Sequence, residues 1–255
     1  MNYYDREEWP HFLSAIRAAP TDDLPRMVAA DWLEENGEPE RAEFVRVQCE
    51  IAKSGPTPLL LYRENELFSP GVGVWESFRD RYPEFVILTP SQCQPGHYTG
   101  SRHLTVSRGF ITTVRATLSA LLGGECPRCG GAGENRVAVD RQYTKFQNLT
   151  CSDCHGTGRT VGVLRELVRR EPVERIELSD REPYHAADGL WYYDDRHGAD
   201  IYALPDDVLN LLGGEYAESA GTGYRSCGFP TESAARDALS AALIRWASQP
   251  VFELR

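Results

Sequence analysis

The sequence contains no long hydrophobic run. No uninterrupted apolar stretch is longer than that of "LLLY" at residues 59–62, which is far shorter than the roughly 20 residues that span a bilayer. The first ten residues, "MNYYDREEWP", carry charges where a secretory signal peptide has an apolar segment. We therefore expect a cytoplasmic protein that does not associate with membranes.

Basic residues are also scarce relative to acidic ones. The 255 residues include 27 Lys and Arg against 38 Asp and Glu, a formal net charge of -11. A surface field of this sign repels phosphate backbones, so the composition disfavours non-specific nucleic-acid binding. Hydrophobic residues make up 41% of the chain, which is enough to form a substantial core.

Sequence patterns of the common catalytic machineries are missing too. There is no Ser-His-Asp arrangement, no phosphate-binding loop and no dinucleotide fingerprint. We interpret Asp31 as a paired acid rather than a catalytic acid, with Arg41 or Arg46 as its partner. Its neighbour Trp32 is interpreted as an anchor of the helical core. We therefore expect that the protein is not an enzyme.

What the sequence does contain is a duplicated cysteine motif. The pattern Cys-x-x-Cys-x-Gly-x-Gly occurs at residues 126–133 and again at residues 151–158. In a reducing compartment such cysteines persist as thiols or metal ligands rather than as disulfides. Two Cys-x-x-Cys knuckles provide four thiolates for one tetrahedral ion, which is a closed and therefore structural site. The pattern predicts one structural zinc ion bound by Cys126, Cys129, Cys151 and Cys154.

Two other interpretations of these cysteines stay open. The string "CSDCH" at residues 151–155 matches the haem-attachment pattern, but haem leaves the first knuckle unexplained. A dithiol oxidoreductase places its Cys-x-x-Cys at a helix N-terminus, whereas glycine-rich turns flank both knuckles here. Gly131, Gly133, Gly156 and Gly158 allow turns that direct backbone amides at the sulfurs, which favours zinc.

Apolar spacing and turn residues outline the elements around the cysteines. Three helical patterns in the first fifty-five residues end at Pro20, Gly37 and Gly55. Alternating residues from 103 to 117 predict a hairpin, and the last amphipathic helix is expected to begin at Thr231.

Two apolar frames follow the L-x-x-L-x-L spacing of leucine-rich repeats. They begin at Ile111 and at Val173, 62 residues apart, and removing the 35 residues 126–160 leaves 27, a period typical of such repeats. We therefore predict an α+β fold in three parts. These are a helical module at 1–55, a leucine-rich-repeat-like α/β domain at 56–125 and 161–255, and an inserted zinc-binding β-hairpin at 126–160.

The N-terminal segment "PRMVAADWLEENGEPERAEFVRVQCEIA", residues 25–52, resembles the bacterial repeat-companion domain, a short helical module found beside leucine-rich-like repeats. The stretches "SRGFITTV", "VERIEL" and "YRSCGFPTESAARDALSAALIRWA" resemble the downstream parts of such proteins. No catalytic residues accompany that family, so the resemblance implies a fold rather than an activity. The cysteine segment resembles the zinc-binding repeats of DnaJ-type cochaperones, which carry four repeats for two zinc sites. Two repeats here imply one site.

The sequence supports two functional hypotheses. The first is a non-catalytic adaptor or scaffold that binds another protein through the zinc-fixed hairpin. The alternative is a nucleic-acid-binding accessory protein, because residues 126–160 contain five basic and three acidic residues, unlike the acidic remainder. Aromatic and basic residues interleave there at a spacing suited to stacking on single-stranded bases. The candidate binding residues are Arg141, Tyr143, Lys145 and Phe146.

Overall fold

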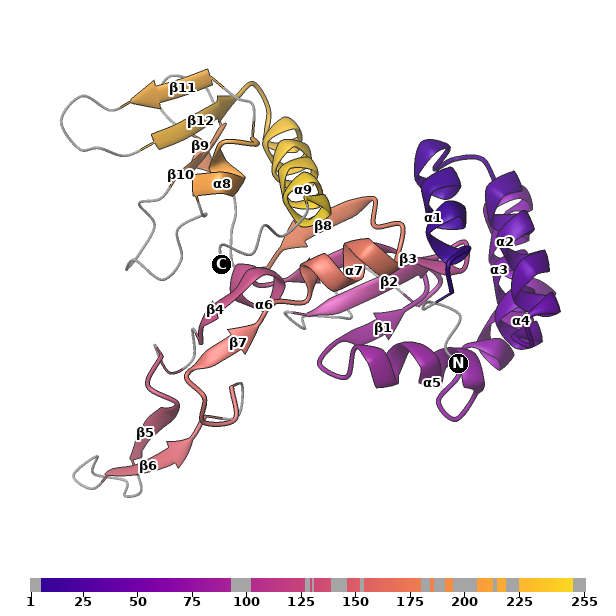
Figure 1. Cartoon of the computed structure of the whole chain (residues 1–255), viewed down its shortest axis with the longest axis horizontal. Coiled ribbons are helices and arrows are strands. Elements are labelled where there is room, and N and C mark those ends of the chain that lie inside the picture. Colours follow the sequence, from indigo (N-terminus) through magenta and orange to yellow (C-terminus); the bar gives the residue numbers. More distant parts are fainter. Residues whose placement is uncertain are drawn as a thin grey trace. The chain divides into compact units, whose positions relative to one another are not determined.

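The computed structural model contains both helices and strands, as predicted for an α+β protein (Figure 1). It describes residues 6–92, 102–126, 129, 131–138, 146–151, 154–179, 184–185, 191–194, 206–212, 215–218 and 225–249. The chain divides into two compact units, 1–115 with 167–177 and 116–166 with 178–255. The three-part division with boundaries at residues 55, 125 and 160 stays a prediction. Within the described ranges, no helix combines the length and the apolar character that a bilayer crossing requires.

Five helices open the first unit. Each of the first four has a proline in its first turn, where the missing N–H costs nothing and the fixed φ favours the helix. Gly55, at φ 84°, ends the third helix. The helices are α1 (Trp9–Ala18), α2 (Leu24–Glu35), α3 (Pro39–Ser54), α4 (Pro58–Leu67) and α5 (Gly73–Arg81).

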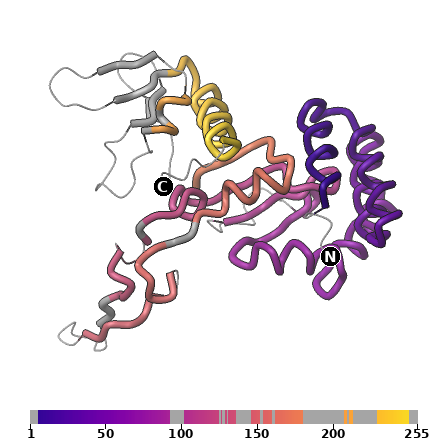
Figure 2. The backbone as a smooth tube through the Cα atoms, viewed as in Figure 1, coloured from indigo at the N-terminus to yellow at the C-terminus, as the bar shows by residue number. Residues whose placement is uncertain are grey.

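Apolar side chains of α1, α2 and α3 form one core with Phe110, and Figure 2 shows these helices at the indigo end of the chain. Trp9 is 1% exposed, and its ring centroid lies 6.1 Å from that of Phe110 and 5.8 Å from that of Trp32. Trp32 itself is only partly buried and packs against this core at its edge. Trp9, rather than the predicted Trp32, is therefore the buried tryptophan of this core.

The acid beside Trp32 is paired, as expected. Asp31 accepts a hydrogen bond of 2.7 Å from the Arg46 guanidinium. Arg41, the other predicted partner, is 2% exposed, and its guanidinium carbon lies 4.2 Å from the ring centroid of Phe78. Arg41 thus contributes cation–π contacts to the interior of the first unit.

A four-stranded sheet completes the first unit, in the order β1-β2-β3-β8. Its strands are β1 (Val86–Leu88), β2 (His103–Ser107), β3 (Phe110–Ala116) and β8 (Arg175–Leu178). β1 pairs with β2 in parallel, and β2 and β3 form the predicted antiparallel hairpin. Its turn is Arg108-Gly109, and both of these residues have positive φ. The amide of Glu174, the residue before β8, donates to the Thr112 carbonyl of β3 at 2.8 Å.

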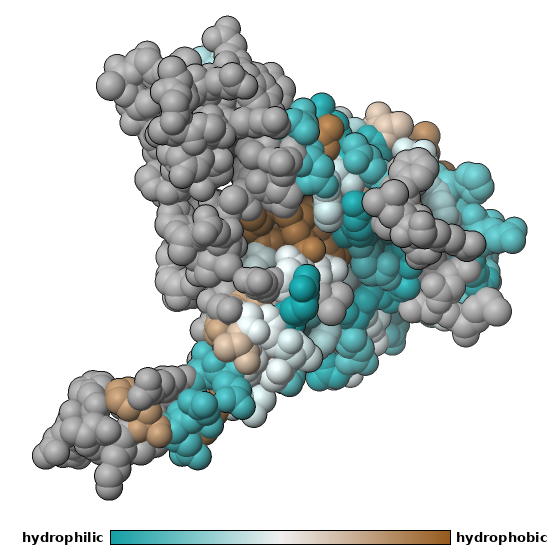
Figure 3. Space-filling model, turned by 60° about the vertical axis from the view of Figure 1, so that its left-hand side comes forward, coloured by the Kyte–Doolittle hydropathy of each residue, from teal (hydrophilic) through white to brown (hydrophobic). Residues whose placement is uncertain are grey.

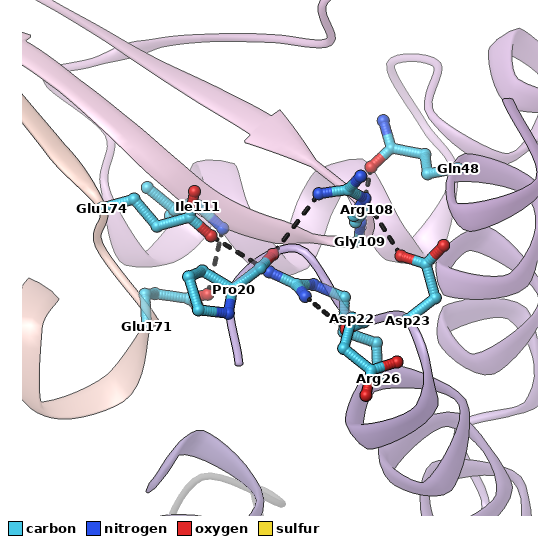
Figure 4. Close-up of polar contacts among 10 residues, drawn as sticks. All are labelled: Pro20, Asp22, Asp23, Arg26, Gln48, Arg108, Gly109, Ile111, Glu171 and Glu174. Atoms are coloured by element: carbon cyan, nitrogen blue, oxygen red, sulfur yellow. Dashed lines mark hydrogen bonds and ion pairs between the residues drawn. The ribbon is translucent and has the colours of Figure 1, made fainter. Parts of the chain in front are cut away.

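Polar contacts hold the segment 167–177 against the first two helices (Figure 4). The fully buried Arg26 side chain pairs with Glu174 at 3.0 Å, and the Trp9 indole N–H donates to the Arg170 carbonyl at 3.3 Å. The buried Glu171 carboxylate accepts from the Ile111 amide at 3.2 Å. The chain that returns from the cysteine segment is therefore anchored by residues near the N-terminus.

The second unit contains the cysteine segment and a second sheet. α9 begins one residue after Thr231, whose hydroxyl caps it by accepting from the Ala234 amide at 3.1 Å. The antiparallel sheet has the order β11-β12-β10-β9. The remaining elements are α6 (Leu118–Leu122), β4 (Gly123–Glu125), β5 (Glu134–Ala138), β6 (Phe146–Thr150), β7 (Arg159–Val161), α7 (Leu164–Arg170), β9 (Tyr184–His185), β10 (Trp191–Asp194), α8 (Asp206–Leu209), β11 (Glu215–Glu218), β12 (Arg225–Phe229) and α9 (Glu232–Ser248).

Candidate metal centre

The structure brings four cysteine sulfurs together. The Sγ atoms of Cys126, Cys129, Cys151 and Cys154 all lie within 4.8 Å of one another. Cys129 is partly buried and the other three are buried, so the thiols form a small internal cluster. Such a cluster can hold one metal ion.

The sulfur spacing fits a tetrahedral ion. The Sγ atoms of Cys126 and Cys151 are 3.7 Å apart, and those of Cys129 and Cys154 are also 3.7 Å apart. Four sulfurs at about 2.3 Å from a tetrahedral ion lie about 3.8 Å from one another. Because four protein ligands fill a tetrahedral shell, no position is left for water or substrate. One metal ion held by all four sulfurs would therefore have a closed coordination shell.

Hydrogen bonds repeat across the two knuckles. The Cys126 amide donates to the Gly158 carbonyl at 2.8 Å, and the Cys151 amide donates to the Gly133 carbonyl at the same distance. The Gly133 amide donates to the Cys129 sulfur at 3.2 Å. In the second knuckle, the Gly158 amide donates in the same way to the Cys154 sulfur at 3.3 Å. Amides directed at sulfur stabilise the negative charge of thiolate ligands.

The strands around the knuckles follow the same symmetry. β4 and β7 form an antiparallel pair, the outer ribbon, in which Glu125 lies opposite Arg159. β5 and β6, which lie between β4 and β7 in the sequence, form a second pair, named the inner ribbon for this place in the sequence. In this ribbon Glu134 lies opposite Thr150. A shift of 25 residues, the spacing of equivalent cysteines, relates these two registers. The cysteine segment is therefore a duplicated unit with an approximate two-fold axis through the thiol cluster.

Two glycines make close approaches that no other residue permits. A Cβ at Gly158, which has φ 71°, would lie 2.1 Å from the Gly131 carbonyl oxygen. A Cβ at Gly133, at φ 77°, would lie 2.4 Å from the Gly156 carbonyl oxygen. The glycines of the motif thus allow the two knuckles to pack backbone to backbone.

We expect Gly158→Ala to weaken metal binding at least tenfold, because its methyl group would force the knuckles apart. Gly156→Ala is the matched control. Gly156 has a similar φ of 85°, but its Cβ would meet only a Thr150 side-chain methyl group at 3.2 Å. Competition with a chromophoric chelator measures both affinities. Equal affinities in the two variants would show that the close approach has no role in metal binding.

Two other residues of ligand type, His155 and Cys49, are not part of the cluster. His155 is exposed and has a φ of 50°, as expected for a turn residue rather than a ligand. Cys49 is buried in the first unit, where burial and then the nearby Asp23 carboxylate raise the pKa of its thiol to about 12. Cys49 therefore stays protonated at neutral pH.

Of the predicted binding residues, only Phe146 belongs to the part of the chain that the structure describes. It lies on β6 with a side chain that is 45% exposed, and Arg141, Tyr143 and Lys145 lie outside the described residues. Leu149, which was not among the predicted binding residues, is 46% exposed on the same strand. Figure 3 shows hydrophobic surface on this ribbon.

Comparisons with family models, curated proteins and solved structures find no match to this chain.

Proposed function

We propose that the protein is a non-catalytic zinc-binding adaptor that binds another protein through the inner ribbon. The observation that supports this most directly is the exposure of all five residues of β6, next to a closed cluster of four cysteines. A structural ion at that place would stabilise a two-stranded ribbon in which every residue of β6 is exposed.

Zinc is the proposed metal. Thiolates select soft ions, and four of them in a tetrahedral arrangement are typical of zinc or of an iron–sulfur centre. A single closed site with sulfur pairs 3.7 Å apart suits one zinc ion with about 2.3 Å bonds. We also propose that the segment is a DnaJ-type repeat pair. Its two Cys-x-x-Cys-x-Gly-x-Gly units support this, since two such units provide one site.

The apolar residues of the inner ribbon support a protein partner. Phe146 and Leu149 are three residues apart on a strand, so they lie on opposite faces of the ribbon. Both are exposed, by 45% and 46%, although each belongs to a residue type that is usually buried. A partner that covers the ribbon would remove both from water.

For the rest of the chain we propose a leucine-rich-repeat-like layer beside a repeat-companion-type helical module. The apolar residues of both L-x-x-L-x-L frames are buried, with exposures from 0% at Ile111 to 7% at Leu178. The amides of Glu174 and Ser179 donate to the carbonyls of Thr112 and Ala116, so the two frames run side by side in one direction. This is the relation that successive repeats have in a solenoid.

We expect the double change Phe146→Ser and Leu149→Ser to weaken binding to a protein partner roughly thirtyfold, as loss of two apolar contact residues does in other interfaces. The partner is first isolated with the wild-type chain, and its affinity is then measured with purified components. The control is the double change Gln147→Ser and Asn148→Ser, on exposed polar residues of the same strand. Metal content should be unchanged in both. Equal affinity of the two variants would exclude the ribbon as the binding surface.

The second candidate function is single-stranded nucleic-acid binding, favoured by the five basic and three acidic residues of the segment 126–160. This function predicts that the affinity for an oligonucleotide falls steeply as the salt concentration rises. After the double change Arg141→Ala and Lys145→Ala, the affinity should depend less on salt. The chain's net charge of -11 opposes such binding, so we favour the protein partner.

A further inference from the structure

A pocket of about 500 Å³ lies in the first unit, and none of the four clustered cysteines lines it. Residues at the end of α3, on α4 and after β1 line it. This volume is within the range of small-molecule sites, which are mostly apolar with a few placed polar groups. The apolar part of its wall consists of Ile51, Ala52, Pro56, Leu61 and Pro90.

The polar part of the pocket is centred on the carboxylate of Glu64, which is 4% exposed. One oxygen accepts from the Gln48 side-chain amide at 2.8 Å, and the other accepts from the Ser91 hydroxyl at 2.5 Å. Gln48 is itself held in one orientation. Its Nε2 also donates to the Val106 carbonyl at 3.1 Å, and its Oε1 accepts from the Gly109 amide (Figure 4).

Both donors to Glu64 are neutral groups. The single hydroxyl proton of Ser91 goes to the carboxylate, so the Thr89 hydroxyl donates to Ser91 at 2.7 Å. An ionised carboxylate has about four acceptor positions, of which these donors use two. Among the residues that the structure describes, no Lys, Arg or His pairs with Glu64.

Arg108 is a cationic residue of the pocket lining, but its guanidinium binds groups other than Glu64. Its Nε pairs with Asp23 at 3.0 Å, and its Nη1 donates to the Pro20 carbonyl at 3.3 Å. A buried carboxylate without a countercharge is costly, and a cationic group from solution removes that cost. Within the described ranges, the pocket thus combines apolar walls with one carboxylate that no cationic side chain pairs with.

We infer that this pocket binds a small primary amine with an apolar body. The ammonium donates to the free acceptor positions of Glu64, and the apolar body lies against Ile51 and Leu61. This site is independent of the proposed adaptor function, because it shares no residue with the cysteine segment.

The test uses 4-phenylbutylamine as the probe, with 4-phenylbutan-1-ol and 4-phenylbutyrate as isosteres of different charge. Calorimetry on the full chain should show that the amine binds about tenfold more tightly than the alcohol, and that the carboxylate does not bind. Equal binding of the amine and the alcohol, tighter binding of the carboxylate, or no binding of any probe at millimolar concentration would overturn the inference.

Two variants locate the site. Glu64→Gln should abolish the preference for the amine, whereas Glu66→Gln should keep it, because Glu66 is an exposed residue of α4 paired with Arg63 at 3.0 Å. Ala52→Phe should fill the pocket while leaving the Glu64 hydrogen bonds intact, so it tests the site even if Glu64→Gln does not fold. Amine binding that survives Ala52→Phe or Glu64→Gln would place the amine elsewhere and overturn the proposal.

Discussion

Cys151→Ser should reduce the bound metal from one ion per chain to none after dialysis against a mild chelator. A structural zinc ion contributes on the order of 10 kcal/mol at neutral pH, and removal of one of four thiolates eliminates much of that free energy. Cys151 is 0% exposed and its Sγ lies 3.7 Å from that of Cys126, so the change removes a ligand from the interior of the cluster. Elemental analysis of the purified protein gives the stoichiometry.

The same variant should leave the first unit folded. The cysteines form a cluster of their own, separate from the core built around α1, α2 and α3. Far-ultraviolet circular dichroism should therefore retain most of its helical signal, while the amides of β5 and β6 lose protection from hydrogen exchange. Cys49→Ala is the control and should keep one metal ion per chain, since Cys49 lies in the other core. Cooperative loss of the helices in Cys151→Ser would show that the metal site stabilises the whole chain.

Trp9→Ala should lower the free energy of unfolding of the first unit by about 3 to 5 kcal/mol, the usual cost of deleting a large buried aromatic side chain. Trp9 is 1% exposed, stacks on Phe110 and donates to the Arg170 carbonyl at 3.3 Å. Its removal leaves a cavity and a carbonyl without its indole donor at the same place. Urea unfolding followed by circular dichroism measures the loss.

Trp32→Ala is the matched comparison. The sequence alone predicts the large effect for Trp32, but this ring lies at the edge of the core, 5.3 Å from the Phe12 ring centroid. We expect a loss of about 1 to 2 kcal/mol, as is usual for partly buried sites. Trp9→Phe should lose less than Trp9→Ala because it keeps a ring against Phe110. A larger loss for Trp32→Ala than for Trp9→Ala would reverse our assignment of the core centre.

Local features of this protein were predictable from the sequence because local chemistry determines them. Prolines and glycines mark helix ends through their own dihedral angles, and Thr231 caps the helix that begins at the next residue. The Cys-x-x-Cys spacing selects the four thiols that the structure brings together, since each knuckle is a turn of a few residues. The hairpin of β2 and β3 follows from alternation around a Gly-containing turn.

Only the tertiary structure decided which residues meet across long separations. Apolar spacing shows that a helix has a buried face, but it does not show that Trp9 rather than Trp32 lies at the centre of the core. Arg26 and Glu174 pair across 148 residues, and Gln48 meets Gly109 across 61. The carboxylate of the pocket depends on such contacts, because Glu64 accepts hydrogen bonds from Gln48 and Ser91, which belong to two separate segments. Chain packing, rather than any local pattern, places these side chains together.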